Sequence, residues 1–153
     1  MTGVINPAKN PTETAGSIAM EEQPEAPKPK HVLVVDDNVD LAQTYQALFE
    51  AHDYRVTLAD NGIVALKLLE QTEVDAILCD ISMPQLEGDM FYLTVGRVWP
   101  KLLPRFVFVT GNADNPKYAK FLANVSAKVL CKPVKIDELL QAIQAVCAQP
   151  AGT

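Results

Sequence analysis

Short runs of apolar residues alternate along most of the chain with longer segments in which apolar residues recur every three or four positions. The runs are rich in β-branched residues and predict strands at 32–35, 54–58, 75–79, 105–109 and 127–131. The periodic segments predict helices at 39–50, 62–70 and 136–147, and weaker patterns predict two more at 87–99 and 116–124. This alternation is typical of a three-layer α/β domain with right-handed crossovers.

Two of the predicted helices are preceded by residues that cap helices. Asp37 and Asn38 come before the first helix, and Asp60 and Asn61 come before the second. Their side-chain oxygens accept hydrogen bonds from the backbone N–H groups of a first turn. The first, third and fourth apolar runs are nearly continuous, as expected for strands buried on both faces of a parallel sheet.

The two ends of the chain lack these patterns. Residues 1–30 hold five of the eleven prolines and no aromatic residue. Such a segment buries too little apolar surface to offset the entropy lost on ordering. We therefore predict a flexible, proline-rich tail at 1–30, a folded domain at 31–148 and a frayed end at 149–153.

Charge and cysteine content narrow the class of protein. The 153 residues include 13 Lys or Arg and 19 Asp or Glu, a formal net charge of −6, which disfavours binding to nucleic acid or to an anionic membrane. Cys79, Cys131 and Cys147 have neither metal-ligand nor disulfide-framework spacing and are interpreted as reduced thiols. No apolar run is long enough to cross a bilayer. We expect a cytoplasmic protein.

Charged or hydroxyl side chains follow four of the five predicted strands. Asp36 and Asp37 follow the first strand, Asp80 the third, Thr110 the fourth and Lys132 the fifth. Taken singly, such residues more often form turns or cap helices. In a parallel sheet, however, all strand ends of this kind meet at one edge. Three carboxylates there would repel one another unless a cation offset their charge.

The chemistry of these residues indicates a site that handles phosphate. Carboxylate ligands favour Mg²⁺, with Mn²⁺ as the alternative ion. A divalent ion held by carboxylates beside a lysine and a hydroxyl is a usual arrangement for phosphoryl groups. The residues thus predict one Asp as nucleophile, two Asp that hold the metal, and Thr110 and Lys132 as groups that bind the transferred phosphoryl group.

Four motifs together resemble the receiver domain of two-component response regulators. They are Val32-Leu-Val-Val-Asp-Asp-Asn38, Cys79-Asp-Ile-Ser-Met-Pro84 followed by Gly88, Val109-Thr-Gly-Asn112, and Cys131-Lys-Pro133. The resemblance covers about residues 31 to 148. It implies a doubly wound, five-stranded parallel sheet of flavodoxin-like order 2-1-3-4-5, with helices on both faces. In that order Cys79 and Cys131 lie two strands apart, beyond the reach of a disulfide.

The resemblance also implies a role for each site residue. Asp80 would accept a phosphoryl group from a histidine kinase or a phosphotransfer protein. Asp37, Asp80 and the backbone carbonyl of Ser82 would bind Mg²⁺ directly, and Asp36 would act through a coordinated water. Thr110 would hydrogen-bond a phosphoryl oxygen, and Lys132 would pair with the phosphoryl group.

The function implied is a phosphorylation-controlled signalling module that acts through contacts with an unknown downstream protein. Such a module is not an enzyme beyond its own phosphorylation and dephosphorylation. It would be a single-domain response regulator or the C-terminal receiver of a hybrid sensor histidine kinase.

Two alternatives stay open. One is a Mg²⁺-dependent phosphatase or phosphotransferase with an Asp nucleophile, which is disfavoured because Ser82 stands where such enzymes commonly carry a second Asp. The other is a non-phosphorylated pseudo-receiver that only binds partners. This second alternative is disfavoured because Asp37, Asp80, Thr110 and Lys132 are all present.

One position departs from the receivers of the best-known type. Val129, three residues before Lys132, stands where those receivers carry a Tyr or Phe that moves with the Thr. Tyr118 and Phe121 on the preceding helix are candidates for its role, although core positions are the commoner use of such residues. His31 and His52 are isolated from other polar motifs, and we predict structural or exposed positions for both.

Overall fold

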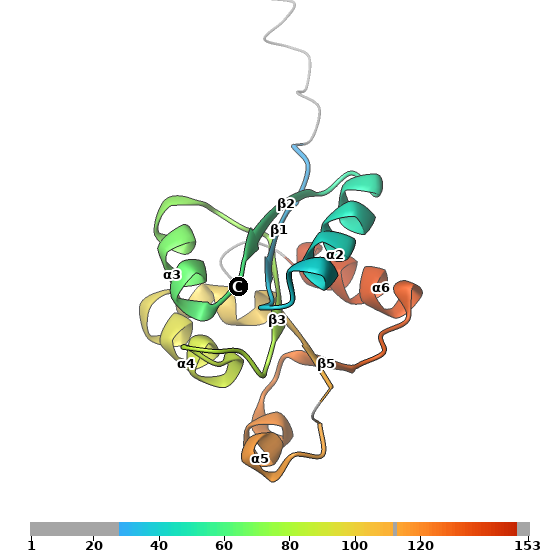
Figure 1. The fold of residues 1–153 in the computed structure, drawn as a ribbon. Helices are drawn as coiled ribbons and strands as arrows, with labels where there is room; N and C mark the ends of the chain where they lie inside the picture. The colour runs from blue at the N-terminus through green and yellow to red at the C-terminus, as the bar shows by residue number, and fades with distance from the viewer. Residues whose placement is uncertain (1–27, 112, 150–153) are drawn as a thin grey trace, which may run out of the picture.

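A parallel sheet of five strands forms the centre of the protein (Figure 1). The structure is a computed structural model in which residues 28–111 and 113–149 are described. The strands are β1 (His31–Val35), β2 (Arg55–Ala59), β3 (Ala76–Asp80), β4 (Phe106–Thr110) and β5 (Lys128–Cys131). They are parallel and lie in the order β2-β1-β3-β4-β5, so the order implied by the resemblance is confirmed. Most of the predicted tail (1–27) and of the predicted frayed end (150–153) lie outside the described residues.

The strand bounds differ from the predicted ones by one residue. The predictions ended β3 and β4 at the last apolar residue, whereas β3 extends to Asp80 and β4 to Thr110. Backbone pairing continues through these polar residues, because Asp80 pairs with Val109 and Thr110 pairs with Cys131. Two candidate site residues are therefore held by the sheet itself and not by a loop.

All five predicted helices are present and cover both faces of the sheet. They are α2 (Val39–Ala51), α3 (Gly62–Gln71), α4 (Gly88–Val98), α5 (Pro116–Asn124) and α6 (Ile136–Cys147). Helices α2 and α6 pack on one face, and α3 and α4 pack on the other (Figure 1). Helix α5 contributes Tyr118 and Phe121 to the core on the side of α3 and α4. Of the predicted capping residues, Asn38 accepts from the Leu41 N–H (3.0 Å) and Asn61 from the Val64 N–H (2.9 Å).

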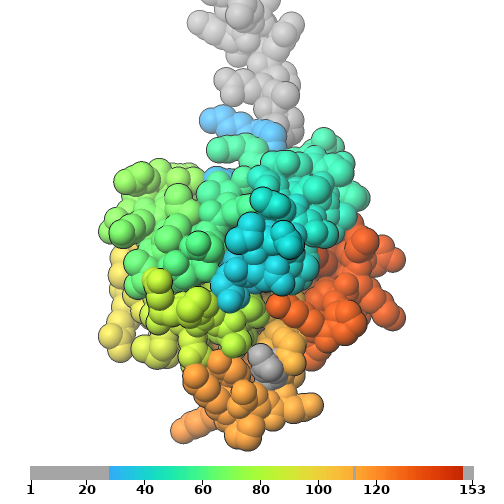
Figure 2. Space-filling view, viewed as in Figure 1, coloured from blue at the N-terminus to red at the C-terminus, as the bar shows by residue number. Residues whose placement is uncertain are grey.

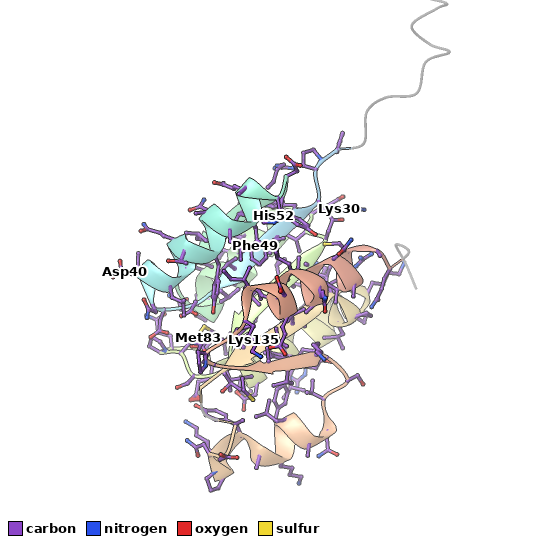
Figure 3. The ribbon with its side chains drawn as sticks, turned by 90° about the vertical axis from the view of Figure 1, so that its right-hand side faces the viewer. Lys30, Asp40, Phe49, His52, Met83 and Lys135 are labelled. Atoms are coloured by element: carbon purple, nitrogen blue, oxygen red, sulfur yellow. The ribbon has the colours of Figure 1, made fainter. Side chains whose placement is uncertain are left out.

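The sheet separates two hydrophobic cores, and β1 contributes to both. Val32 and Val34 point into the core under α2 and α6, while Leu33 and Val35 point into the other. Figure 3 shows Phe49 of α2 between α2 and α6, and its side chain is fully buried. Because successive side chains of β1 point into opposite cores and both cores are apolar, the sequence of the strand is one continuous apolar run.

The second core is rich in aromatic rings. The ring of Tyr92 on α4 lies 4.9 Å from that of Phe106, and the ring of Phe121 on α5 lies 5.5 Å from that of Phe108, both edge to face. Such pairs favour fixed ring positions over a loosely packed core. Trp99 lies at the end of α4 and packs partly against this core.

The isolated histidines have structural or exposed positions, as predicted. His31 is buried; its Nδ1 donates to the Glu73 carbonyl (3.0 Å), and its Nε2 is bonded to the Thr57 hydroxyl (2.7 Å). His52 is exposed at the end of α2. The three cysteines are free thiols. Among helices in the described part of the chain, none combines the length and the apolar character needed to cross a membrane.

A short 3₁₀ helix, η2 (Pro100–Arg105), was not predicted. The sequence patterns ended a helix at 99 and began a strand at 105, and they predicted no element between the two. In the structure Arg105, its last residue, donates a hydrogen bond from Nη1 to the carbonyl of Val146 in the last turn of α6 (2.7 Å). The segment therefore ties the start of β4 to the end of α6.

Replacing Arg105 by Met should lower the free energy of unfolding by about 1.5 kcal/mol, because a charge-assisted hydrogen bond to a helix end is lost. Urea unfolding measures this change. Lys101→Met removes the same charge from an exposed position of η2 and serves as the matched control. Equal effects of the two substitutions would contradict a specific contribution from the Arg105 bond.

Candidate functional site

Three carboxylates meet at the carboxyl edge of the sheet. One oxygen from each of Asp36, Asp37 and Asp80 can be chosen so that all three lie within 4.8 Å of one another. Asp36 and Asp80 are 3% and 7% exposed, whereas Asp37 is exposed. The strand register explains the convergence, because Val35 pairs with Cys79 and each is followed directly by one of the buried acids.

Local hydrogen bonds hold the loop after β1. The Asp36 N–H donates to the Ala59 carbonyl (3.0 Å), which extends the pairing with β2. The Asp36 carboxylate accepts from the Asn38 N–H (2.9 Å), and Asn38 in turn caps α2. The Asp36 carboxylate is thus fixed by a turn that also starts α2. Asp36 therefore has the turn-forming role that is common for such residues and is at the same time a candidate site residue.

Lys132 is the cation that faces the buried acids. Its Nζ lies 3.6 Å from Asp80 Oδ1 and 3.8 Å from Asp36 Oδ2. Its backbone N–H donates to the Thr110 carbonyl (2.8 Å), and a cis peptide bond joins it to Pro133. Both ion-pair distances exceed those of a direct hydrogen bond, so Lys132 offsets the charge of the acids without a direct hydrogen bond to either of them.

The electrostatics of the cluster favour an additional positive charge. Burial raises the pKa of Asp80 to about 6; Lys132 opposes this shift and Asp36 adds to it. Burial also raises the pKa of Asp36, although the hydrogen bond from the Asn38 N–H and the charge of Lys132 both lower it. One lysine therefore does not compensate for two buried carboxylates and a third beside them.

Tyr45 on α2 is a neighbour of the site that the sequence did not reveal. Burial, followed by the charges of Asp36 and Asp80, raises its pKa to about 12. It lies on the apolar stripe of its helix, so the pattern indicated a core position only. Tyr45 is buried in the core under α2 and α6, and its nearness to the acids depends on how α2 crosses the sheet.

Thr110 and Ser82 lie at the same edge. Thr110 is fully buried at the end of β4, one residue after Val109, which pairs with Asp80. Ser82 is exposed in the loop that follows β3. Gly88 closes that loop: its N–H donates to the Ile81 carbonyl (2.8 Å), and a Cβ there would overlap the Asp80 carbonyl oxygen. Asn112, part of the motif after β4, lies outside the described residues.

Three segments at or next to the site adjoin on one side of the molecule. Figure 2 shows the start of α2 in cyan, the loop after β3 in yellow-green and the region of α5 in orange, one below the other. The structure therefore brings together Asp36, Asp37, Asp80 and Lys132, and it places Thr110 and Ser82 at the same edge. The arrangement offers oxygen ligands to a divalent cation and a lysine to an anion.

Curated relatives include both short and long proteins. The chain is 30% identical over 115 residues to "Response regulator receiver protein CpdR" of Brucella abortus, an alignment that covers 75% of this chain and 94% of that protein. It is 27% identical over 124 residues to "Transcriptional regulatory protein GlrR" of Escherichia coli, covering 81% of this chain but 28% of that protein. The match to the longer relative thus spans only about a quarter of its length.

Solved structures give the same picture of the fold. The crystal structure of a response regulator receiver domain protein (CheY-like) from Methanospirillum hungatei matches with a TM-score of 0.70 and 26% identity, covering 78% of this chain and 94% of that one. The response regulator receiver domain family model matches residues 32–144. Since this range holds the sheet from its second residue, Val32, onward and most of α6, the chain belongs to the receiver domains of two-component response regulators.

Proposed function

We propose that Asp80 accepts a phosphoryl group in a Mg²⁺-dependent reaction and that the chain acts as a phosphorylation-controlled module of a two-component phosphorelay. The observation that carries this proposal is the cluster of Asp36, Asp37 and Asp80 within 4.8 Å, faced by Lys132. Receiver domains are in general phosphoacceptor modules that bind Mg²⁺ through acidic residues, and this chain supplies such residues at the edge expected for them.

The residues present fit a Mg²⁺ ion. The three candidate ligands are carboxylates. Burial raises the pKa of Asp36 and of Asp80 although Lys132 lowers both, so a bound cation would stabilise their ionised forms. Asp37, Asp80 and the Ser82 carbonyl would hold the ion, and Asp36 would act through a water. A bound Mg²⁺, or Mn²⁺ in its place, supplies charge that offsets both the carboxylates and the phosphoryl oxygens.

Each residue has a defined part in the transfer. A carboxylate oxygen of Asp80 bonds to phosphorus while the P–N bond to the histidine of the donor breaks, and the leaving nitrogen keeps the electron pair and takes up a proton. With a pKa of about 6, Asp80 is ionised at pH 7 by roughly ten to one, as a nucleophile requires. The Lys132 ammonium, 3.6 Å from Asp80 Oδ1, would pair with the phosphoryl oxygens, and the Thr110 hydroxyl would donate to one of them.

The partners follow from this step. Receiver domains of two-component systems are generally phosphorylated by histidine kinases, so the donor proposed here is a histidine kinase or a phosphotransfer protein in the cytoplasm. The signal would leave through contacts with a downstream protein. A single-domain regulator and the C-terminal receiver of a hybrid kinase would carry out the same transfer.

Incubation with acetyl phosphate and Mg²⁺ should add the mass of one phosphoryl group to the intact protein, since acetate can leave in place of the histidine. Intact mass spectrometry measures the addition. Asp80→Asn should abolish it, whereas Asp89→Asn, a change in the first turn of α4, should leave it. Chelation of Mg²⁺ should also prevent labelling.

The other outcomes identify the alternatives. Continued release of phosphate from small phosphoesters, at a rate lost in Asp80→Asn, would indicate a phosphatase or phosphotransferase. The absence of both labelling and Mg²⁺ binding in the folded wild type would indicate a pseudo-receiver and would refute the proposed function.

The raised pKa of Asp80 predicts a dependence of stability on pH. Because the pKa in the folded state (about 6) exceeds the ordinary value of 3.8, the folded protein binds this proton more tightly than the unfolded chain does. The resulting stabilisation is complete below about pH 4 and is lost as the pH rises through 6. In EDTA, the unfolding free energy of the wild type should therefore fall by about 3 kcal/mol relative to Asp80→Asn over that range.

Urea unfolding of both proteins between pH 4 and 7.5 measures this difference. Glu70→Gln, which changes an exposed carboxylate of α3, is the control and should follow the wild type. A flat difference between wild type and Asp80→Asn would show that Asp80 gains no proton affinity on folding.

Saturating Mg²⁺ should raise the melting temperature of the wild type by about 5 °C, because the ion binds the folded state only. Asp37→Asn should reduce this shift by more than half, since a direct ligand is lost. Differential scanning calorimetry with and without Mg²⁺ measures both values. An unchanged shift in Asp37→Asn would remove Asp37 from the ligand set.

A further inference from the structure

A side chain on α5 contacts the loop between β3 and α4. The Tyr118 hydroxyl donates a hydrogen bond to Glu87 Oε1 (2.5 Å), and Lys117 pairs with Glu87 Oε2 (2.7 Å). Glu87 directly precedes α4, so a residue 31 positions further along the chain holds the end of this loop. In Figure 2 the loop (yellow-green) and the region of α5 (orange) adjoin.

The two ends of this contact differ in how firmly they are held. Tyr118 as a whole residue is 3% exposed and belongs to the second core, whereas the Glu87 side chain is 25% exposed. Hydrogen bonds from Lys117 and Tyr118 lower the pKa of Glu87, which keeps it ionised as an acceptor. Tyr118 is therefore the fixed point, and the loop is the part it restrains.

Tyr118 also lies near Ser82, at the start of the loop. The Ser82 side chain lowers the pKa of the Tyr118 hydroxyl, whereas the hydrogen bond to Glu87 and burial raise it. Tyr118 thus has neighbours at both ends of the loop, and its direct hydrogen bond is to Glu87.

The loop is fixed at its base as well. The bond from the Gly88 N–H to the Ile81 carbonyl (2.8 Å) closes it, and the tight approach of Gly88 to the Asp80 carbonyl leaves no space for a side chain there. The base therefore sets where the loop begins and ends. The position of the exposed residues between them, Ser82 included, is left to contacts such as those with Tyr118.

We propose that Tyr118 is a positioning residue that holds the β3–α4 loop, and with it the Ser82 carbonyl, in the arrangement needed for cation binding, and thereby couples the loop to α5. The inference rests on the proposed function, because it assigns the Ser82 carbonyl to the metal site. It also gives α5 a link to the site that does not require an aromatic residue at Val129 of β5.

The test uses Tyr118→Phe, which keeps the ring and removes only the hydroxyl. Tyr92→Phe is the matched control, since Tyr92 packs in the same aromatic core and its hydroxyl makes no hydrogen bond with the described residues. Isothermal titration with Mg²⁺ should show a dissociation constant about ten-fold higher in Tyr118→Phe, as for lost partners of metal ligands. Tyr92→Phe should bind Mg²⁺ as the wild type does.

Two further measurements separate positioning from folding. In the metal-free proteins, amide hydrogen exchange of residues 81–88 should be faster in Tyr118→Phe than in the wild type and unchanged in Tyr92→Phe. Glu87→Gln changes the other end of the contact while leaving the second core intact. It should also weaken Mg²⁺ binding, with a urea midpoint close to that of the wild type.

The outcomes are distinct. If the wild type binds Mg²⁺ and both Tyr118→Phe and Glu87→Gln bind it equally well, the positioning role is wrong and the proposed function stands. If the folded wild type binds no Mg²⁺, the proposed function fails and this inference fails with it. The inference is supported if Tyr118→Phe binds Mg²⁺ more weakly and exchanges the loop amides faster, while Tyr92→Phe does neither.

Discussion

The close approach of two buried carboxylates, Asp36 and Asp80, is the constraint on which the rest of the structure depends. It follows from the pairing of Val35 with Cys79, since the next residue of each strand must then lie at the same edge. Asp36 follows β1 and Asp80 ends β3, two strands whose residues are all buried, and the two acids are themselves only 3% and 7% exposed. Lys132, whose Nζ lies 3.6 Å from Asp80 and 3.8 Å from Asp36, lowers the pKa of each acid, but burial, the larger effect, keeps both pKa values raised.

The loops around this edge restrain the acids against their repulsion. The Asn38 N–H holds the Asp36 carboxylate, the Thr110 carbonyl holds the backbone of Lys132, and the Ile81 carbonyl holds the start of α4. Each bond involves backbone that the adjoining helix or strand already orders, so little further entropy is lost in making it. The electrostatic repulsion among the acids is thus opposed by several hydrogen bonds, and the same bonds fix where the adjoining helices begin.

The fold and most of the candidate site were predictable because both follow from local patterns and one topological rule. Continuous apolar runs indicate buried parallel strands, and the carboxyl ends of such strands meet at one edge, so Asp36, Asp80 and Lys132 could be grouped without contact information. The one-residue errors in β3 and β4 arose because polarity, not backbone pairing, was used to end the strands. The 3₁₀ helix at Pro100–Arg105 depends on a bond to α6, which no local pattern contains.

The neighbours of the site were harder to predict for the same reason. Tyr118 and Glu87 lie 31 residues apart, and only the packing of α5 brings them together. Tyr45 belongs by its spacing to an apolar stripe, yet it lies near enough to the site that the charges of Asp36 and Asp80 add to the effect of burial in raising the pKa of its hydroxyl to about 12. Together with the buried hydroxyl of Thr110, it gives the edge polar groups that add no positive charge. A second buried cation would remove the carboxylate repulsion in the folded protein, and it would also remove the reason for Mg²⁺ to bind. In the proposed function, the charge left uncompensated by Lys132 is therefore what makes the site responsive to metal and phosphoryl group.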